Sequence, residues 1–288
     1  MTVDLRAFHT PEHSPFLWRG GENAALLVHG FPGTPSEMRR VGRLLHEQGW
    51  TVHGLLLPGF GSTIGELPQR RHADWVAAIE QALAELSREH RHILLVGNSM
   101  GAALSLHAAA RHPVAGLILF APFWRVDSWL DKVYPLAATV FPEIRPFQRA
   151  RFSDPKFQAM VRQFLPDADL DDAAVQAALR DIRIPTQVLG QVRRSGQLGY
   201  HAAAQVTAPT LIVQGTQDTL VKPAVTKRLA ERLPNLVGLV EAPGGHELIN
   251  SYDGSWPTIA AAVARFAATV AVQAPGVSSH TTIQPTNQ

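Results

Sequence analysis

One serine lies in a sequence context that could make it a nucleophile. Ser99 is the central residue of Gly97-Asn98-Ser99-Met100-Gly101, which fits the pattern G-x-S-x-G. An apolar run at residues 93–96 precedes it, and a helix-forming segment at residues 102–108 follows it. In a strand–turn–helix unit of this kind the two glycines allow a tight turn, which exposes the serine Oγ at the start of the helix. The sequence contains no cysteine, so a thiolate nucleophile is excluded and Ser99 is the predicted nucleophile.

A serine hydroxyl needs a general base, and the sequence offers thirteen histidines for that role. His246 lies in Gly244-Gly245-His246-Glu247, a glycine-rich loop after the last apolar run of the core. Parallel sheets place their sites at the carboxyl ends of the strands, so His246 is where a base is expected. Other histidines lie within helices, beside helix ends or in terminal and inserted segments, where a structural or surface role is expected: His9, His13, His46, His90, His92, His107, His201 and His280.

A carboxylate must orient this histidine, because it fixes the tautomer and stabilises the imidazolium that forms during catalysis. Asp218 follows the predicted strand at residues 211–214, in the turn Gly215-Thr216-Gln217-Asp218. The order along the chain is then nucleophile, acid and base. Glu247 is the alternative acid, but its direct adjacency to His246 makes the required geometry awkward. Asp218 is therefore the predicted orienting acid.

Attack on a carbonyl group also needs an oxyanion hole, because negative charge grows on the carbonyl oxygen. The backbone N–H of Met100, directly after the nucleophile, is one predicted donor. The second should come from the loop His29-Gly30-Phe31-Pro32-Gly33, which follows the first strong apolar run. Pro32 has no N–H, so Phe31 is the predicted second donor.

These residues need a scaffold, and the chain alternates between short apolar runs and longer amphipathic segments. This alternation is typical of an α/β fold, with a mostly parallel sheet and helices on both of its faces. In the first predicted helix Thr34 is the cap, and Glu37 is expected to complete a capping box. The predicted strands are residues 24–28, 51–57, 93–96, 114–120, 209–215 and 237–241, and the predicted helices are residues 34–48, 74–89, 99–111, 223–233 and 256–270.

A stretch rich in aromatic residues and proline interrupts this alternation at residues 122–206. Its composition predicts an inserted, mainly helical region, so that residues 1–121 and 207–272 together form the core domain. Residues 273–288 are rich in Ser, Thr, Pro and Gln, which predicts a disordered tail.

Charge and targeting signals are weak. The 26 Lys and Arg against 24 Asp and Glu give a formal charge of +2, which does not indicate nucleic-acid binding. The densest basic stretch, residues 145–162, is expected to be a solvated helical face. No signal sequence and no run of about 18 apolar residues is present, which predicts a soluble, cytoplasmic protein without stable membrane insertion. The oligomeric state is left open.

Together the motifs resemble the α/β-hydrolase superfamily, especially its bacterial carboxylesterases and monoacylglycerol-lipase-like enzymes. The resemblance covers about residues 16–272 apart from the insertion and rests on His29-Gly30-Phe31-Pro32-Gly33, Leu57-Pro58-Gly59-Phe60-Gly61, the Ser99 elbow, the Asp218 turn and Gly244-Gly245-His246-Glu247. Family members often have histidine where this chain has Phe60, so no catalytic duty is assigned to Phe60. The resemblance implies an α/β-hydrolase fold whose insertion is a cap over the active site, with Trp124 and Trp129 as candidate substrate contacts.

The predicted function is hydrolysis of a small-molecule or lipid carboxylic ester, through a Ser-His-Asp triad and an acyl-enzyme intermediate. No cofactor is needed, and the sequence contains no metal-ligand motif such as H-E-x-x-H. A thioesterase, an amidase or peptidase, or a carbon–carbon-bond hydrolase would use the same triad, so these alternatives stay open. The alternative of a different class is a non-catalytic ligand-binding protein with this fold, and the complete set of nucleophile, base and acid argues against it.

Overall fold

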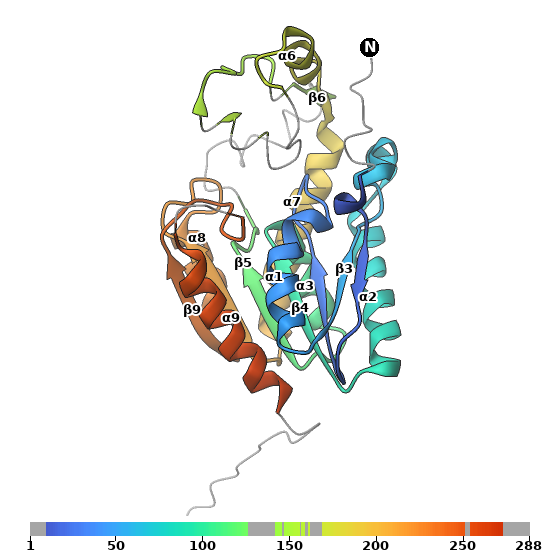
Figure 1. The fold of residues 1–288 in the computed structure, drawn as a ribbon, viewed down its shortest axis with the longest axis vertical. Helices are drawn as coiled ribbons and strands as arrows, with labels where there is room; N and C mark the ends of the chain where they lie inside the picture. The colour runs from blue at the N-terminus through green and yellow to red at the C-terminus, as the bar shows by residue number, and fades with distance from the viewer. Residues whose placement is uncertain are drawn as a thin grey trace, which may run out of the picture.

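The computed structural model describes residues 10–125, 142–145, 147–155, 157–158, 161, 169–250 and 254–272 of the 288-residue chain. Its centre is a seven-stranded sheet in the order β1-β3-β2-β4-β5-β8-β9 (Figure 1). Neighbouring strands are parallel, except that β1 and β3 are antiparallel. The strands are β1 (Phe16–Trp18), β2 (Asn23–Val28), β3 (Thr51–Leu55), β4 (His92–Asn98), β5 (Gly116–Phe120), β8 (Thr210–Gly215) and β9 (Leu236–Ala242).

Helices cover both faces of this sheet (Figure 1). Residues of β2 alternate between the two cores: Leu26 and Val28 pack on one face, and Ala25 and Leu27 on the other. Burial on both faces explains why the strands read as continuous apolar runs in the sequence. One face carries α1 (Arg39–Glu47) and α9 (Trp256–Ala271), and the other carries α2 (His72–Glu89), α3 (Met100–Ala109), α7 (Thr186–Ala202) and α8 (Pro223–Ala230).

The predicted fold class is confirmed, and two details differ from the sequence-based expectation. The edge strand β1 was not predicted, because three residues are too few to show a periodic pattern. The helix expected to start after Thr34 begins instead as a short 3-10 helix, η3 (Pro35–Met38), and continues as α1. Three further 3-10 helices are η2 (Pro11–His13), η4 (Gly61–Gln69) and η5 (Ala203–Gln205).

Part of the insertion forms a smaller lobe beyond the carboxyl ends of the strands (Figure 1). It contains α6 (Ala173–Arg180) and one antiparallel pair of two-residue strands, β6 (Glu143–Ile144) and β7 (Ile184–Pro185). A small apolar cluster separate from the main core stabilises this lobe, and its buried members are Phe152, Val161, Leu170 and Leu179.

α7 connects this lobe to the core. At its start the Thr186 N–H donates a hydrogen bond to the Pro142 carbonyl (2.9 Å). Near its end Gly199 lies so close to α3 that a Cβ at this position would overlap the backbone of Ala103. The helix therefore contacts both parts of the molecule, and the domain boundaries placed at residues 122 and 206 stay predictions.

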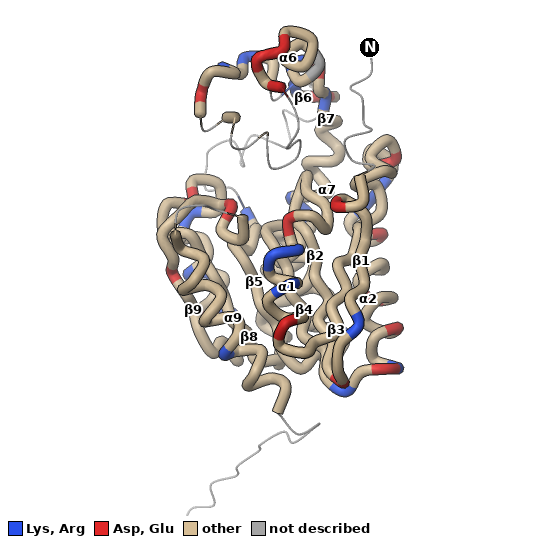
Figure 2. Tube along the Cα trace, viewed as in Figure 1, with Lys and Arg blue, Asp and Glu red and all other residues tan. Residues whose placement is uncertain are grey.

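Charged residues lie mostly on the helices and loops at the surface, and Figure 2 shows Lys and Arg gathered on α1. Within the predicted basic face, Arg145, Arg149 and Arg151 are exposed but lie in turns and loops. The helical prediction is wrong for these residues, because the closely spaced prolines of this stretch remove donors that a helix needs.

The predicted tail, residues 273–288, lies outside the described residues. In the described ranges, no helix has both the length and the apolar character needed to cross a bilayer.

Candidate active site

Ser99 lies in the turn between β4 and α3, at the carboxyl end of a central strand. Its backbone has φ 51° and ψ −113°, a conformation that non-glycine residues rarely adopt. No side chain fits at the flanking glycines: a Cβ on Gly97 would lie 2.6 Å from the Ala102 backbone, and one on Gly101 would overlap carbonyl oxygens at the end of β2. The local sequence thus forms a tight elbow that holds Ser99 at the N-terminus of α3.

The three residues predicted to form a triad meet at the carboxyl ends of β4, β8 and β9. His246 Nε2 lies 2.9 Å from Ser99 Oγ, and His246 Nδ1 lies 2.8 Å from Asp218 Oδ2. An ionised carboxylate can only accept hydrogen bonds, so Nδ1 carries the proton and Nε2 of the neutral ring is left to accept from the Ser99 hydroxyl. The geometry is that of a nucleophile, a general base and an orienting acid in one hydrogen-bonded chain.

Asp218 is enclosed, and both of its oxygens are hydrogen-bonded. Oδ1 accepts from the N–H groups of Leu220 (2.9 Å) and Val221 (2.8 Å), and Oδ2 accepts from Gln214 Nε2 (3.3 Å) and from His246. A buried carboxylate without donors would be costly, and these donors offset its loss of hydration. Asp218, rather than the alternative acid, is the carboxylate that contacts His246.

A close approach of two loops brings Asp218 to His246. Gly215 ends β8, and a Cβ there would lie 2.6 Å from the Gly244 carbonyl oxygen. The Gln217 N–H donates to the same carbonyl at 2.9 Å. Only glycine at position 215 allows the turn that carries Asp218 to lie this close to the loop that carries His246.

The charges around His246 favour its protonated form. Burial by itself lowers the pKa of His246, but the hydrogen bond and the charge of Asp218 outweigh burial. The carboxyl groups of Glu247 and Glu37 act in the same direction as Asp218, so the pKa of His246 is raised above its ordinary value of 6.5. A histidine of this kind is a stronger base than free imidazole, and it loses that function when acid protonates it.

The loop at residues 29–33 lies directly against the nucleophile. A Cβ on Gly30 would lie 3.2 Å from both Ser99 Cβ and the Asn98 carbonyl oxygen. The Phe31 N–H of this loop has no acceptor within the described part of the chain. Met100 is the first residue of α3, so its N–H precedes the first helical hydrogen bond. Both predicted oxyanion donors therefore adjoin the elbow with their N–H groups unused.

His29 and Phe60 support this loop. His29 Nε2 accepts from the Leu57 N–H (3.1 Å), and Nδ1 donates to the Gly30 carbonyl (2.9 Å). Burial lowers the pKa of His29 to about 4, so the ring is neutral at pH 7. The fully buried Phe60 ring packs edge-on against the rings of His29 (5.0 Å) and Phe31 (6.1 Å). Phe60 is a packing residue of the site.

The sequence patterns do not identify two polar residues of this site. Glu37 does not complete the expected capping box; its Oε1 instead accepts hydrogen bonds from the Gly30 N–H and from Asn98 Nδ2 (3.0 Å). Gln214 is buried beside Asp218 and holds its carboxylate. A lone polar residue in an apolar strand could have indicated Gln214, whereas the capping pattern offered a sufficient explanation for Glu37.

Trp124 packs between helices. Its ring stacks on Tyr200 of α7 with centroids 4.0 Å apart, and its Nε1 donates to the Val225 carbonyl of α8 (2.9 Å). The Arg125 guanidinium lies 4.9 Å from the indole centroid. The predicted substrate contact of Trp124 gains no support from these contacts, and Trp129 lies outside the described residues.

A second serine and histidine are also in contact. His72 Nδ1 lies 2.9 Å from Ser195 Oγ, and His72 Nε2 lies 2.8 Å from His107 Nδ1. Ser195 is fully buried in α7, and its hydroxyl donates to the Gln191 carbonyl at 3.0 Å. No substrate carbonyl could reach this oxygen, so the pair is a structural contact between α2 and α7, and His107 extends it to α3.

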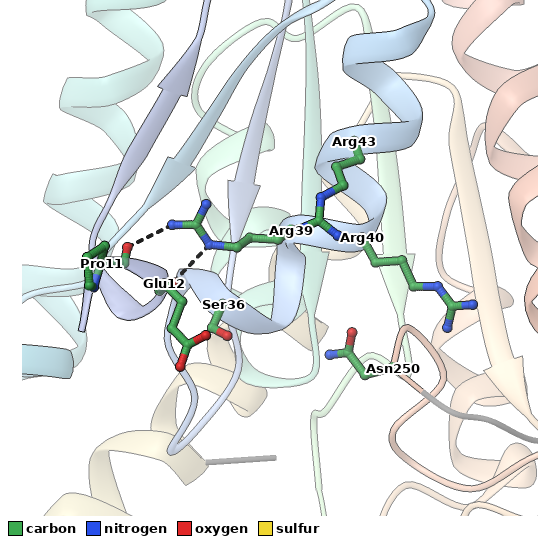
Figure 3. A pocket seen from close by; sticks show the side chains of 7 residues that line it. All are labelled: Pro11, Glu12, Ser36, Arg39, Arg40, Arg43 and Asn250. Carbon is green, nitrogen blue, oxygen red and sulfur yellow. Dashed lines mark hydrogen bonds between the residues drawn. The ribbon is translucent and has the colours of Figure 1, made fainter. Parts of the chain in front are cut away.

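A polar hollow of about 680 Å³ opens between η3, α1 and the loop after β9 (Figure 3). None of the triad residues lines it. Two of its arginines join segments of the fold: Arg39 donates to the Pro11 carbonyl (3.0 Å), and Arg40 donates to the Ile249 carbonyl (3.2 Å). The hollow is lined by Pro11, Glu12, Ser36, Arg39, Arg40, Arg43 and Asn250.

Across the described residues, no group of three or more His, Asp or Glu side chains could hold a metal ion.

Comparisons with known proteins show which family the chain resembles. Residues 22–253 match the Hydrolase_4 family, described as serine aminopeptidase, S33. The thermostable monoacylglycerol lipase of Bacillus sp. (strain H-257) is 27% identical over 211 residues, which are 73% of this chain and 76% of that protein. The carboxylesterase of Bacillus subtilis (strain 168) is 33% identical over 105 residues, which are 36% of this chain and 43% of that protein.

A solved structure shows the same fold. The structure described as LipS and LipT, two metagenome-derived lipolytic enzymes, superposes with a TM-score of 0.69 at 23% identity, and covers 90% of this chain and 98% of that chain. The family match spans most of the chain and includes Ser99, Asp218 and His246. The predicted class of enzyme is thereby confirmed. The chain belongs to the Hydrolase_4 family and is a serine hydrolase of the α/β-hydrolase fold that is similar to esterases and lipases.

Proposed function

We propose that this protein hydrolyses carboxylic esters of small molecules or lipids through an acyl-enzyme on Ser99. The observation that carries the proposal is the hydrogen-bonded chain of Asp218, His246 and Ser99 on a strained elbow beside the 29–33 loop. The names of the relatives, a monoacylglycerol lipase and a carboxylesterase, support an ester as the substrate.

In the acylation step Ser99 Oγ attacks the ester carbonyl while its proton passes to His246 Nε2. The Asp218 carboxylate stabilises the imidazolium that results. The new oxyanion accepts hydrogen bonds from the N–H groups of Phe31 and Met100, and the positive end of the α3 dipole lies at the same place. His246 then gives its proton to the leaving alcohol as the carbon–oxygen bond breaks.

In the deacylation step a water molecule takes the place of the alcohol. His246 removes a proton from this water, and the hydroxide attacks the acyl carbonyl of Ser99. The second tetrahedral intermediate uses the same oxyanion donors. The intermediate collapses to release the carboxylic acid, and the proton on His246 returns to Ser99 Oγ.

We also propose that the insertion acts as a cap. Its lobe lies beyond the carboxyl ends of the strands (Figure 1), which is the end of the sheet that carries Ser99, Asp218 and His246. A lobe in this position would border the path by which an acyl group reaches Ser99, and so would influence the acyl length that is accepted.

A substrate panel tests the proposal. We expect a series of p-nitrophenyl esters or monoacylglycerol to be turned over at least about tenfold more efficiently, as kcat/KM, than acyl-CoA or amino-acid p-nitroanilides. A fluorophosphonate should label Ser99. Preference for the anilides would instead favour a peptidase, as the family description suggests, and preference for acyl-CoA would favour a thioesterase. A chain that turns over none of these substrates and resists the label would contradict the proposal.

A further inference from the structure

The side chain and backbone of Glu37 contact three separate loops. Oε1 accepts from the Gly30 N–H and from Asn98 Nδ2 (3.0 Å), and the Glu37 carbonyl accepts from Asn250 Nδ2 (3.0 Å). Asn250 belongs to the loop after β9, and Figure 3 shows it beside the start of α1. One residue of η3 thereby joins the segments that carry the nucleophile, the predicted oxyanion donor and the base.

The two side-chain contacts adjoin the reacting groups. Gly30 directly precedes Phe31, and Asn98 directly precedes Ser99. A single carboxylate oxygen therefore holds one residue of the oxyanion loop and one residue of the elbow at a fixed separation. A carboxyl oxygen has two lone pairs and can accept both hydrogen bonds at once, so this oxygen can anchor both segments.

The loop also fits closely around this carboxyl group. A Cβ on Gly33 would lie 2.7 Å from Glu37 Cδ, and the Gly33 N–H closes the loop by donating to the Gly30 carbonyl (3.1 Å). Burial raises the pKa of Glu37 to about 7, although the two hydrogen bonds and the charge of His246 oppose that rise. The nearby charge of Glu247 adds to it. The charge of a carboxylate in these surroundings depends on the hydrogen bonds that it accepts from Gly30 and Asn98.

We propose that Glu37 is a positioning residue, which locks the 29–33 loop to the nucleophile elbow and so presets the oxyanion hole before substrate binds. The inference rests on the proposed function, because it gives the N–H groups of Phe31 and Met100 their catalytic task. A preset hole stabilises the transition state more than the ground state, so its loss lowers kcat and leaves KM nearly unchanged.

Three variants test this inference on a p-nitrophenyl ester. Glu37→Ala removes both hydrogen bonds, and we expect kcat to fall about 10- to 100-fold with KM within about threefold. Glu37→Gln keeps a carbonyl oxygen that can accept both bonds, so kcat should stay within about fivefold of the wild type. Glu47→Gln, at the exposed end of α1, is the matched control and should be unchanged.

The pattern across these variants decides the inference. A kcat for Glu37→Ala within twofold of the wild type would overturn it, as would a folded Glu37→Gln that loses as much kcat as Glu37→Ala. Thermal melting of each variant shows whether it is folded. Should Glu37→Ala fail to fold, Glu37→Asp replaces it: the shorter side chain cannot reach both donors, so lowered kcat supports the inference and unchanged kcat contradicts it.

Labelling by a fluorophosphonate separates this inference from the proposed function. Phosphonylation of Ser99 also places negative charge in the oxyanion hole, and it requires no knowledge of the substrate. Wild-type protein that labels rapidly but hydrolyses no ester would contradict the proposed function alone. Slower labelling of Glu37→Ala than of Glu37→Gln would then still support the positioning role, and equal rates would overturn it.

Discussion

Two serine–histidine pairs in the described part of the chain have the same separation of 2.9 Å between oxygen and nitrogen. Ser99 faces His246 at the carboxyl ends of the strands, whereas Ser195 of α7 faces His72 at the start of α2. Their backbones differ. Ser99 occupies a strained elbow, while Ser195 lies inside a helix, is fully buried and already donates its proton to a carbonyl oxygen.

The electrostatic surroundings of the two histidines also differ. Asp218 and neighbouring carboxyl groups raise the pKa of His246, despite its burial. Burial and the positive charges of His107, Arg194 and Arg111 lower the pKa of His72 to about 4. The first ring can take and return a proton near neutral pH, and the second stays neutral there. Contact between a hydroxyl and an imidazole therefore does not define a catalytic pair. The backbone conformation of the serine, its accessibility to substrate and the charges around the histidine distinguish the two pairs.

The largest expected difference between the two pairs is in kcat after removal of each serine hydroxyl. Ser99→Ala should lower kcat for a p-nitrophenyl ester by at least about 10⁴-fold, because it removes the hydroxyl that contacts His246 Nε2. Ser195→Ala should leave kcat within about twofold. Steady-state kinetics on both variants, with circular dichroism to establish folding, measures the contrast. A Ser99→Ala variant with undiminished turnover would rule out the assigned nucleophile.

A smaller contrast is expected for the groups that contact the histidines. Asp218→Asn should lower kcat about 10²- to 10⁴-fold, because the amide can donate to Nδ1 and stabilise the wrong tautomer. His107→Gln should have little effect on kcat.

The pH dependence of kcat/KM provides an independent measurement of the Asp218 effect. In the wild type the acid limb should have its midpoint above pH 6.5, since the pKa of His246 is raised and the protonated ring cannot act as a base. In Asp218→Asn the midpoint should move to lower pH. A midpoint that is the same in both proteins would show that Asp218 does not set the pKa of His246.

Short motifs at strand ends made most of the site predictable. The elbow around Ser99, the turn with Asp218 and the loop with His246 each carry their own glycines and follow an apolar run. The sheet then places such ends together, because parallel strands share one carboxyl edge. In the folded chain His246 lies within hydrogen-bond distance of both Ser99 and Asp218.

Features that depend on long-range packing were not predictable. Glu37 fitted a capping box by its spacing, and only the folded chain shows that its carboxyl group turns toward Asn98. Ser195 and His72 are 123 residues apart and share no motif. The lobe was predicted only as mainly helical, because aromatic and proline-rich composition does not specify how its short elements pair.

The smallest effect predicted from the comparison concerns stability. The pKa of His72 is lowered from 6.5 to about 4 in the folded protein, so between these values the unfolded chain binds a proton that the folded protein does not. This contribution to stability is present above pH 6.5 and is lost as the pH falls toward 4. At 1.36 kcal/mol per pKa unit it amounts to about 2–3 kcal/mol between pH 7 and pH 4.5.

His72→Gln should therefore unfold with a weaker pH dependence than the wild type, whatever its stability at pH 7. Urea denaturation at a series of pH values measures both free energies of unfolding. The wild-type value minus the variant value should decrease as the pH falls, because only the wild type loses the His72 contribution. His29, whose pKa is also lowered to about 4, remains in both proteins and contributes equally to both curves. Parallel curves would mean that His72 titrates alike in the folded and unfolded chain. The contact between Ser195 and His72 would then make no pH-dependent contribution to stability.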